Sequence, residues 1–362
     1  MAGGQETGNE TYVKGLVAGF EGAAEDIDLL VFHVGSPWTV GSAHIRFRRL
    51  LTANPYVRLG AELPLRSLAQ RLDVLHMTYA APVWAAAPVV LTVHDICYAT
   101  NPEWFSPRDL HVLTTVVPRS IRQAASIITD SESARRQIIE HYRVPDEKIS
   151  AIPIGAGSAA IPISLEAARQ EMLALGFGLE RPYVLTVGNL QPRKNLVRLF
   201  EAFAALVNGS KHDIDLVIVG PRRFRAEDIT RAASSVAGRI HFTGYISDRQ
   251  LAASYRCSTV FVLPSLYEGF GLPVLEAMTH GVPVVCSDAG ALPEVCGEAA
   301  ILFDPLSVEN IASALDQVLS DTSLRQRLAE AGTIRAREFS WKTTAARTAA
   351  IYRRTSNGRG TK

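Results

Sequence analysis

Short, uninterrupted runs of apolar residues recur along the chain, separated by segments in which apolar residues repeat every three or four positions. Such runs are typical of parallel strands buried on both faces, and the longer spacing is typical of amphipathic helices. In the first half, the runs predict strands at 28–34, 74–79, 89–93, 126–129 and 149–154. Helical patterns lie between most of them, such as 12–20, 110–124 and 131–141.

The second half repeats this alternation after a glycine- and proline-containing linker at 154–162 and a helix at 165–175. Its predicted strands are 183–188, 216–219, 240–242, 259–263, 283–286 and 300–303. Its predicted helices are 196–207, 226–237, 249–255, 308–319 and 324–339. Repeated strand-then-helix order in both halves predicts an α/β fold of two doubly wound parallel-sheet domains. We place them at 1–160 and 161–338.

The two ends of the chain are less regular. Gly3, Gly4 and Gln5 form a glycine loop of the kind that normally follows the first strand of a doubly wound sheet. No strand-like run precedes them, so either the sequence begins downstream of the true start or the N-terminal sheet lacks a strand. Residues 339–362 form a helix with a basic tail, which we expect to pack on the N-terminal domain. The tail is either solvated or touches an anionic surface.

Composition narrows the class of protein. The 362 residues are 47% hydrophobic and 20% charged, as in ordinary globular proteins, and a net charge of +1 argues against a nucleic-acid partner. The four cysteines are scattered without a Cys-x-x-Cys pair, which suggests buried thiols in a reducing compartment. There is neither an apolar run of about 20 residues nor a signal peptide. We therefore expect a cytoplasmic protein, with peripheral membrane contact left open.

The richest candidate chemistry lies just after the predicted strand 259–263. Two carboxylates, Glu268 and Glu276, bracket a glycine loop, and Pro273 stands where a helix would begin. Loop amides and a helix N-terminus suit anionic or hydroxyl-rich ligands, and carboxylates accept hydrogen bonds from hydroxyl groups. This combination fits a sugar joined to a diphosphate.

A second loop at 188–195 follows the first strand of the second domain. Ligands bind at the carboxyl ends of strands in open α/β sheets, and here Arg193 and Lys194 come just before a helix. Both cations and the helix N-terminus could converge on one diphosphate. Taken alone, the loop could equally be a polar connection with chance basic residues. The Glu268–Glu276 stretch in the same domain favours the functional interpretation.

Together these motifs resemble glycosyltransferase family 4, the retaining nucleotide-sugar-dependent enzymes of the GT-B fold. The resemblance covers nearly the whole chain and is strongest over 182–305. Its motifs are Gly188-…-Arg193-Lys194-Asn195, Phe242-Thr243-Gly244-Tyr245, Pro264-Ser265-…-Glu268-Gly269-Phe270-Gly271-Leu272-Pro273-…-Glu276-Ala277-Met278, Gly281-Val282-Pro283-Val284-Val285 and Gly290-…-Pro293-Glu294-Val295.

The resemblance implies roles for individual residues. Arg193 and Lys194 would bind the donor diphosphate and stabilise the leaving group. Glu268 would contact the donor sugar, and Glu276, on the first helical turn, would hold ribose hydroxyls. Favourable placement near a helix N-terminus is the plain alternative for Glu276. The other donor-binding candidates are Gly188, Asn189, Gly244, Tyr245, Gly269, Phe270, Gly271 and Leu272.

In the N-terminal domain, His94 follows the strand 89–93, where the resemblance places a histidine beside the donor sugar and the acceptor. Asp95 could orient its ring or cap the following turn. The resemblance also puts Gly3, Gly4 and Gln5 on the acceptor side. Ser131 fits a helix N-cap better than a ligand contact. Other histidines, such as His44, His76 and His111, are interpreted as structural or surface residues.

Two further patterns are weaker evidence for a function. The triplets Asp26-Ile27-Asp28 and Asp213-Ile214-Asp215 look like metal-binding motifs, but both precede strands, so we interpret them as loop residues and expect no metal. Basic residues gather at 44–49, where Arg46 and Arg49 would share a helical face. That face is either solvated or docks an anionic membrane or a lipid-diphosphate acceptor.

The sequence therefore predicts a retaining glycosyltransferase whose two domains enclose the reaction in a cleft and close to exclude water. The nucleotide sugar is a co-substrate, and we expect no other cofactor. The sequence of residues 188–195 most resembles that of mannosyltransferases, so we expect GDP-mannose as the donor. The leaving diphosphate would deprotonate an acceptor hydroxyl of a surface glycan or lipid-linked saccharide. The alternatives are a UDP-sugar transferase, a nicotinamide-dependent oxidoreductase, and a non-catalytic or truncated homologue. No Gly-x-Gly-x-x-Gly follows either first strand, which counts against the oxidoreductase.

Overall fold

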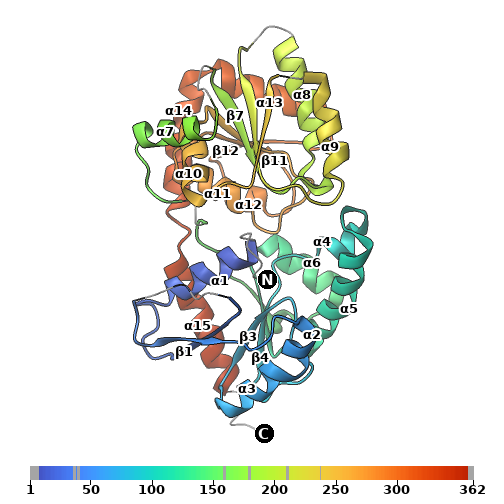
Figure 1. The fold of residues 1–362 in the computed structure, drawn as a ribbon, viewed down its shortest axis with the longest axis vertical. Helices are drawn as coiled ribbons and strands as arrows, with labels where there is room; N and C mark the ends of the chain where they lie inside the picture. Colours follow the sequence, from blue (N-terminus) through green and yellow to red (C-terminus); the bar gives the residue numbers. More distant parts are fainter. Residues whose placement is uncertain are drawn as a thin grey trace. The chain divides into compact units, whose positions relative to one another are not determined.

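The computed structural model describes residues 8–35, 38, 41–157, 160–177, 181–208, 212–236 and 238–357. The chain divides into two compact units (Figure 1). Unit 1 comprises Met1–Gly155 and Ser340–Lys362, and unit 2 comprises Ala156–Phe339. The predicted glycine loop Gly3-Gly4-Gln5 lies outside the described residues.

Unit 1 contains two parallel sheets. A two-stranded sheet pairs β1 (Leu29–His33) with β2 (Ile45–Arg49). A four-stranded sheet has the order β3-β4-β5-β6, built from Leu75–Thr78, Val89–Thr92, Ser126–Thr129 and Ile149–Ala151. Every residue of β4 and β5 is buried, which explains why both strands read as continuous apolar or small-residue runs.

The helices of unit 1 surround these sheets. They are α1 (Gly8–Gly19), α2 (Pro55–Val57), α3 (Leu63–Ala69), α4 (Cys97–Thr100), α5 (Pro107–Gln123), α6 (Glu132–Tyr142) and α15 (Trp341–Asn357). A π-helical turn, Arg58–Glu62, joins α2 to α3, and short 3₁₀ turns lie at Pro102–Trp104 and Asp146–Lys148. The C-terminal helix α15 packs on α1, far away in sequence. The contact is close because Gly15 faces the Trp341 ring, which would lie 2.1 Å from a Cβ there.

Unit 2 is built on one six-stranded parallel sheet of order β12-β11-β10-β7-β8-β9. The strands are β7 (Tyr183–Val187), β8 (Asp215–Val219), β9 (Ile240–Gly244), β10 (Val260–Leu263), β11 (Val284–Ser287) and β12 (Ala300–Phe303). The order reverses between β7 and β10, the kind of switch point at which open α/β sheets bind ligands.

Helices cover both faces of this sheet, as right-handed crossovers require (Figure 1). One face packs against α8 (Leu196–Asn208), α9 (Ala226–Ala232) and α13 (Val308–Ser320), with Phe200 and Phe203 in the core. The remaining helices are α7 (Leu165–Ala174), α10 (Asp248–Cys257), α11 (Leu272–Thr279), α12 (Leu292–Cys296) and α14 (Thr322–Ala336), with 3₁₀ turns at Pro192–Lys194 and Ala233–Val236.

Two predicted elements are wrong in detail, and one helical segment was not predicted. Residues 45–49 form strand β2, so Arg46 and Arg49 do not share a helical face. The predicted helix 226–237 ends as an α-helix at Ala232 and continues as a 3₁₀ turn. The segment 55–69 was not predicted as a helix, because its apolar positions point outward and its polar anchor points inward.

Candidate active site

The site in unit 2 centres on Glu268, in the loop between β10 and α11. Glu268 is only 7% exposed, and both of its carboxylate oxygens accept hydrogen bonds. Arg193 Nη1 donates to its Oε2 over 2.7 Å, and Lys194 Nζ donates to its Oε1 over 2.7 Å. Ser265 Oγ also donates to Oε1, over 2.6 Å. The two loops predicted from sequence therefore meet at one carboxylate, which bridges both cations.

These contacts fix the charge of Glu268. Burial alone would raise the pKa of its carboxyl group, but the nearby charges of Arg193 and Lys194 outweigh burial and lower the pKa to about 2. The carboxylate is therefore ionised throughout the physiological range. A buried anion held by two cations can accept hydrogen bonds from sugar hydroxyls, and the cations can stabilise negative charge on a leaving group.

Backbone contacts hold the two loops together. Arg193 Nη1 also donates to the carbonyl oxygen of Tyr267 over 2.6 Å, and the amide of Leu266 donates to the Arg193 carbonyl over 2.8 Å. Asn195, with a φ of 55°, donates through Nδ2 to the carbonyl oxygens of Pro264 and Pro305. Asparagine tolerates this left-handed backbone better than most residues. It thereby ties the end of β10 to the start of α8.

A third segment, the turn after β11, packs against the backbone of the Glu268 loop. Gly290 has a φ of 60°, and a Cβ there would lie 2.4 Å from the Glu268 carbonyl oxygen. The amide of Ala291 donates to that same oxygen over 2.9 Å. Ser287 Oγ, at the end of β11, donates to the carbonyl of Ser265 over 2.6 Å. Only glycine fits at 290, which gives a physical reason for the Gly290 motif.

Glu276 lies one turn deeper than the sequence suggested. Leu272 opens α11 and Pro273 is its second residue, which puts Glu276 in the second turn instead of the first. The side chain is buried, and Tyr255 Oη donates to its Oε2 over 2.9 Å. Gly157 approaches so closely that a Cβ there would lie 1.9 Å from Oε1. Its predicted role toward ribose stays a prediction.

The other donor-side candidates lie where strands end. Gly188 follows β7 with a φ of 151°, and a Cβ there would lie 2.7 Å from Lys194 Cε, so glycine makes room for the lysine stem. Asn189 is next in the chain. Gly244 ends β9, and its neighbour Tyr245 is half exposed. Gly269, Phe270 and Gly271 complete the buried loop, and Leu272 begins α11.

Unit 1 contributes a second constellation around His94. Its Nδ1 lies 2.6 Å from Asp130 Oδ2, and the Asp130 carboxylate is almost completely buried. Burial lowers the pKa of His94, but the Asp130 charge and hydrogen bond outweigh it, so the pKa is raised. Among the described residues, no hydrogen-bond partner reaches His94 Nε2. That nitrogen is buried and is the ring atom still open to a further hydrogen bond.

A buried polar network lies behind His94. The Tyr12 ring packs edge-on against His94 at 4.7 Å, and Tyr12 Oη bonds to Thr92 Oγ1. His76 connects the same Thr92 to Tyr352 of α15, with distances of 2.7 and 2.5 Å. Burial, followed by the charge of His94, lowers the pKa of His76 to about 3. His76 is thus a neutral structural residue, as predicted.

Sequence reasoning left the role of Asp95 open and missed Asp130. Asp95 Oδ1 accepts from the amide of Cys97 over 3.1 Å, so Asp95 caps the following turn. The ring of His94 is instead held by Asp130. The available signal was that Asp130 follows β5 just as His94 follows the neighbouring β4. Ser131 accepts from the amide of Ala134 and is the N-cap of α6, as expected.

The aspartates of both triplets lie at the amino ends of strands and pair with basic side chains. Asp213 binds Arg181 and Arg239, at 3.1 and 2.7 Å, and Asp215 binds His241 at 3.1 Å. In unit 1, Asp26 binds Arg353. Asp26, Asp28 and Asp213 precede strands, as predicted, whereas Asp215 is itself the first residue of β8 and not a loop residue. That the protein needs no metal stays a prediction.

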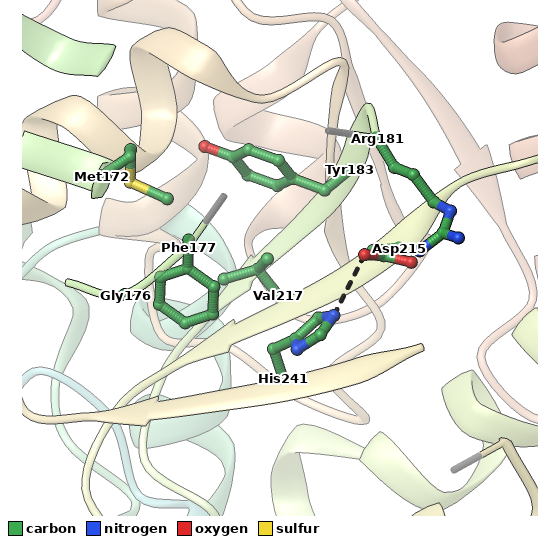
Figure 2. Close-up of a pocket in the computed structure, with 8 residues that line it drawn as sticks. All are labelled: Met172, Gly176, Phe177, Arg181, Tyr183, Asp215, Val217 and His241. Atoms are coloured by element: carbon green, nitrogen blue, oxygen red, sulfur yellow. Dashed lines mark hydrogen bonds and ion pairs between the residues drawn. The ribbon is translucent and has the colours of Figure 1, made fainter. Parts of the chain in front are cut away.

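A small cavity lies close to this aspartate cluster (Figure 2). It has a volume of about 130 Å³, and Met172, Phe177, Tyr183, Asp215 and His241 line it. Tyr183 and Asp215 are the first residues of β7 and β8, so the cavity is at the opposite end of the sheet from Glu268. Sites for organic ligands are usually at least ~300 Å³. The cavity is therefore not a candidate donor site.

The sequence is similar to those of known proteins. Residues 169–335 match the family described as Glycosyl transferases group 1, and residues 6–156 match Glycosyltransferase Family 4. The O-antigen chain mannosyltransferase B of Escherichia coli is 33% identical over 270 residues, which span 73% of this chain and 70% of that protein. The chain belongs to glycosyltransferase family 4. A serotype-specific mannosyltransferase, WbdA of Escherichia coli, is 31% identical over 62% of this chain, but the match spans only 28% of its own length.

Solved structures extend the likeness to the fold. Sucrose-phosphate synthase from Thermosynechococcus elongatus superposes with a TM-score of 0.75 at 23% identity, covering 96% of this chain and 93% of that chain. HepE from Anabaena, in complex with UDP-glucose, gives 0.72 at 20% identity, covering 97% of both chains. This family 4 glycosyltransferase thus has the GT-B fold that its sequence predicted. None of its described helices combines the length and hydropathy of a membrane-crossing segment.

Proposed function

We propose that this glycosyltransferase moves a mannosyl residue from GDP-mannose, with retention of configuration, to a hydroxyl of a surface polysaccharide or glycolipid. The observation that carries the proposal is the Glu268 carboxylate bridging Arg193 and Lys194 at the carboxyl edge of the unit 2 sheet. Two cations beside a buried, ionised carboxylate suit a diphosphate joined to a sugar. Mannose is favoured because the Escherichia coli relatives are named as mannosyltransferases.

In the proposed reaction, Arg193 and Lys194 bind the donor diphosphate and stabilise the charge that develops as the sugar–phosphate bond breaks. Glu268 orients the donor sugar through its hydroxyls, and Glu276 binds the ribose. The departing diphosphate accepts the proton of the acceptor hydroxyl. His94 of unit 1 serves the same reaction through Nε2, beside the donor sugar and the acceptor. No metal takes part, so a chelator should leave the rate unchanged.

The test is release of GDP or UDP by the purified protein from a panel of GDP- and UDP-sugars. We expect GDP release from GDP-mannose to exceed all other signals. Lys194→Ala and Glu268→Ala should each lower it by roughly 100-fold or more. Arg239→Ala is the matched control, because it removes a cation that pairs with Asp213 and Asp215 at the other end of the same sheet. NMR of the product reports whether the anomeric configuration is retained.

The second candidate is a transferase that uses a UDP-sugar, favoured by the fold it shares with HepE, which was solved with UDP-glucose. Selective UDP release would replace GDP-mannose by that donor without changing the site. Unchanged release in Lys194→Ala and Glu268→Ala would contradict the site itself. The absence of release with every donor would favour a non-catalytic homologue.

A further inference from the structure

One stretch of unit 1 exposes its large apolar side chains. It runs from Leu51 through α2, the π-helical turn and α3, which lie at the outer edge of unit 1 in Figure 1. Leu51 is 88% exposed and Tyr56 80%, and Leu65 and Leu68 are each 56% exposed. Single exposed apolar residues are common in folded proteins, but a cluster of this kind marks a surface that something else covers.

The exposed residues form a stripe along the helix. Val57, Ala61, Leu65 and Leu68 follow one another at intervals of four, four and three positions, and all four are exposed. This is the spacing of one helical face. The buried positions lie on the other side, among them Leu63, whose side chain is only 4% exposed. The helix therefore turns an apolar face outward and still has an anchored inner face.

The anchor of this arrangement is a buried carboxylate. Glu62 Oε1 accepts from the amide of Leu51 over 2.6 Å, and its Oε2 accepts from the amide of Thr52 over 3.3 Å. Arg66 Nε donates to Oε1 over 3.1 Å. Glu62 thus ties the turn that carries Leu51 to the middle of the helix. The outward position of Leu51 is held by specific hydrogen bonds.

The same surface continues in the loop after β3. The amide of Val83 donates to the carbonyl oxygen of Leu59, in the π-helical turn, over 3.0 Å. Val83 is 55% exposed, and its neighbour Trp84 is 44% exposed. Tryptophan is enriched where an apolar environment meets water. We call the residues Leu51, Tyr56, Val57, Ala61, Leu65, Leu68, Val83 and Trp84 the apolar face.

Positive charge surrounds the apolar face. Residues 44–72 contain six arginines against one glutamate. Arg58 is buried and Arg66 pairs with Glu62, so the positive charge at the surface comes from the other four arginines. Arg46, Arg48 and Arg49 are exposed on β2, which ends two residues before Leu51, and Arg71 is exposed just after α3. Of these four, Arg46 lies 3.7 Å from the Asp28 carboxylate. An apolar face bordered by arginines is complementary to an anionic surface with an apolar interior.

We propose that the apolar face docks this glycosyltransferase on a membrane that contains anionic lipids. The apolar side chains would enter the boundary between headgroups and acyl chains, and the arginines would lie against the anionic headgroups. A second copy of the chain fits less well. In a two-fold symmetric contact the same patch meets itself, so the arginines of both copies would be brought together. The proposal does not depend on which donor sugar is used.

Sedimentation with lipid vesicles tests the proposal on the full chain. We expect binding to vesicles of phosphatidylcholine mixed with phosphatidylglycerol, much weaker binding to phosphatidylcholine alone, and a decrease with added salt. Leu65→Glu with Leu68→Glu, and separately Arg48→Glu with Arg49→Glu, should each weaken binding at least about tenfold. Leu173→Glu is the matched control, because Leu173 is 58% exposed on α7 of unit 2.

Three results would overturn the proposal. One is absence of binding to the anionic vesicles, and another is equal binding by all variants. The third is a dimer in solution that the Leu65→Glu, Leu68→Glu double variant converts to monomer, which would assign the face to a second copy. Circular dichroism establishes that each variant is folded. Vesicle binding needs no nucleotide sugar, so a failure of the donor assignment leaves this test unaffected.

Discussion

At the scale of single residues, Glu268 is the centre of the candidate site in unit 2, where it pairs with Arg193 and Lys194. Its carboxyl pKa of about 2 lies below the usual 4.5, so ionised Glu268 stabilises the folded state above pH 4.5 and this contribution is lost as the pH falls toward 2. A shift of this size corresponds to about 3 kcal/mol. The two ion pairs that stabilise the folded state are also what lowers the pKa of Glu268.

We therefore expect Glu268→Gln to lower the free energy of unfolding at neutral pH by about 3 kcal/mol, because two partly buried cations lose their counter-charge. Between pH 4.5 and 2 its stability should also fall less steeply than that of the wild type. Chemical denaturation across this pH range measures both effects. Glu171→Gln is the control, since Glu171 pairs with the exposed Arg249 and should change little. Parallel pH profiles for wild type and Glu268→Gln would contradict the assignment.

Asp130 is a positioning residue for His94. Asp130→Asn keeps the size of the side chain but removes the charge that raises the His94 pKa, so that pKa should fall. The wild-type imidazolium is favoured to a higher pH than in the variant. NMR titration of His94 measures the shift, and we expect transfer to slow by roughly 10- to 100-fold. Ser131→Ala is the control, because it removes the α6 N-cap and keeps the Asp130 carboxylate, so it should leave the His94 titration in place. An unchanged His94 pKa in Asp130→Asn would refute the positioning role.

How far the sequence predicts the site differs between these residues. Arg193 and Lys194 belong to one contiguous motif and Glu268 to another, and the two motifs together, in the same domain, indicate ligand chemistry. Asp130 lies 36 positions from His94, and only the pairing of β4 with β5 brings them together. Asp95 shows the same limit. From the sequence alone, a carboxylate next to His94 could either orient the imidazole ring or cap the following turn, and the structure shows that it caps the turn.

At the scale of elements, the Glu268 loop depends on the turn after β11. A Cβ at Gly290 would meet the backbone of Glu268 at 2.4 and 2.8 Å, and the φ of 60° is unfavourable for alanine. Gly290→Ala should therefore displace the loop and lower transfer by more than its cost in stability explains. Gly176→Ala is the control for backbone strain alone, because Gly176 has a φ of 82° and open space around it. Equal activity in both variants would mean that the loop tolerates the displacement.

Elements were predictable where burial follows the standard pattern. Strands β7, β10 and β11 in the middle of the unit 2 sheet are almost entirely buried, so their apolar runs predict their positions to within one or two residues. The prediction that Arg46 and Arg49 share a helical face is wrong because their three-residue spacing arises by chance within strand β2. Only the pairing of this segment with β1 identifies it as a strand. The helix 55–69 was missed because periodicity methods assume that the apolar face points inward.

At the scale of the whole molecule, the chain leaves unit 1 after Gly155 and returns to it at Ser340. The first residue of the returning helix, Trp341, lies edge-on to Tyr12 at 6.1 Å and fits against glycines 15, 19 and 155. Tyr12 in turn contacts His94. The C-terminal segment is therefore part of the structure that supports His94, which the sequence indicated only as a helix expected to pack on the N-terminal domain.

Trp341→Ala should reveal this dependence. Removing the indole leaves a cavity beside Tyr12, and we expect the free energy of unfolding of unit 1 to fall by about 3 kcal/mol or more. Since Tyr12 packs on His94 at 4.7 Å, the His94 titration should shift as well, whereas the Glu268 site of unit 2 should keep its donor affinity. Calorimetry and NMR measure the two effects, with the exposed Trp84 mutated to alanine as the control. A Trp341→Ala protein with unchanged unfolding and an unchanged His94 pKa would show that α15 is dispensable for unit 1.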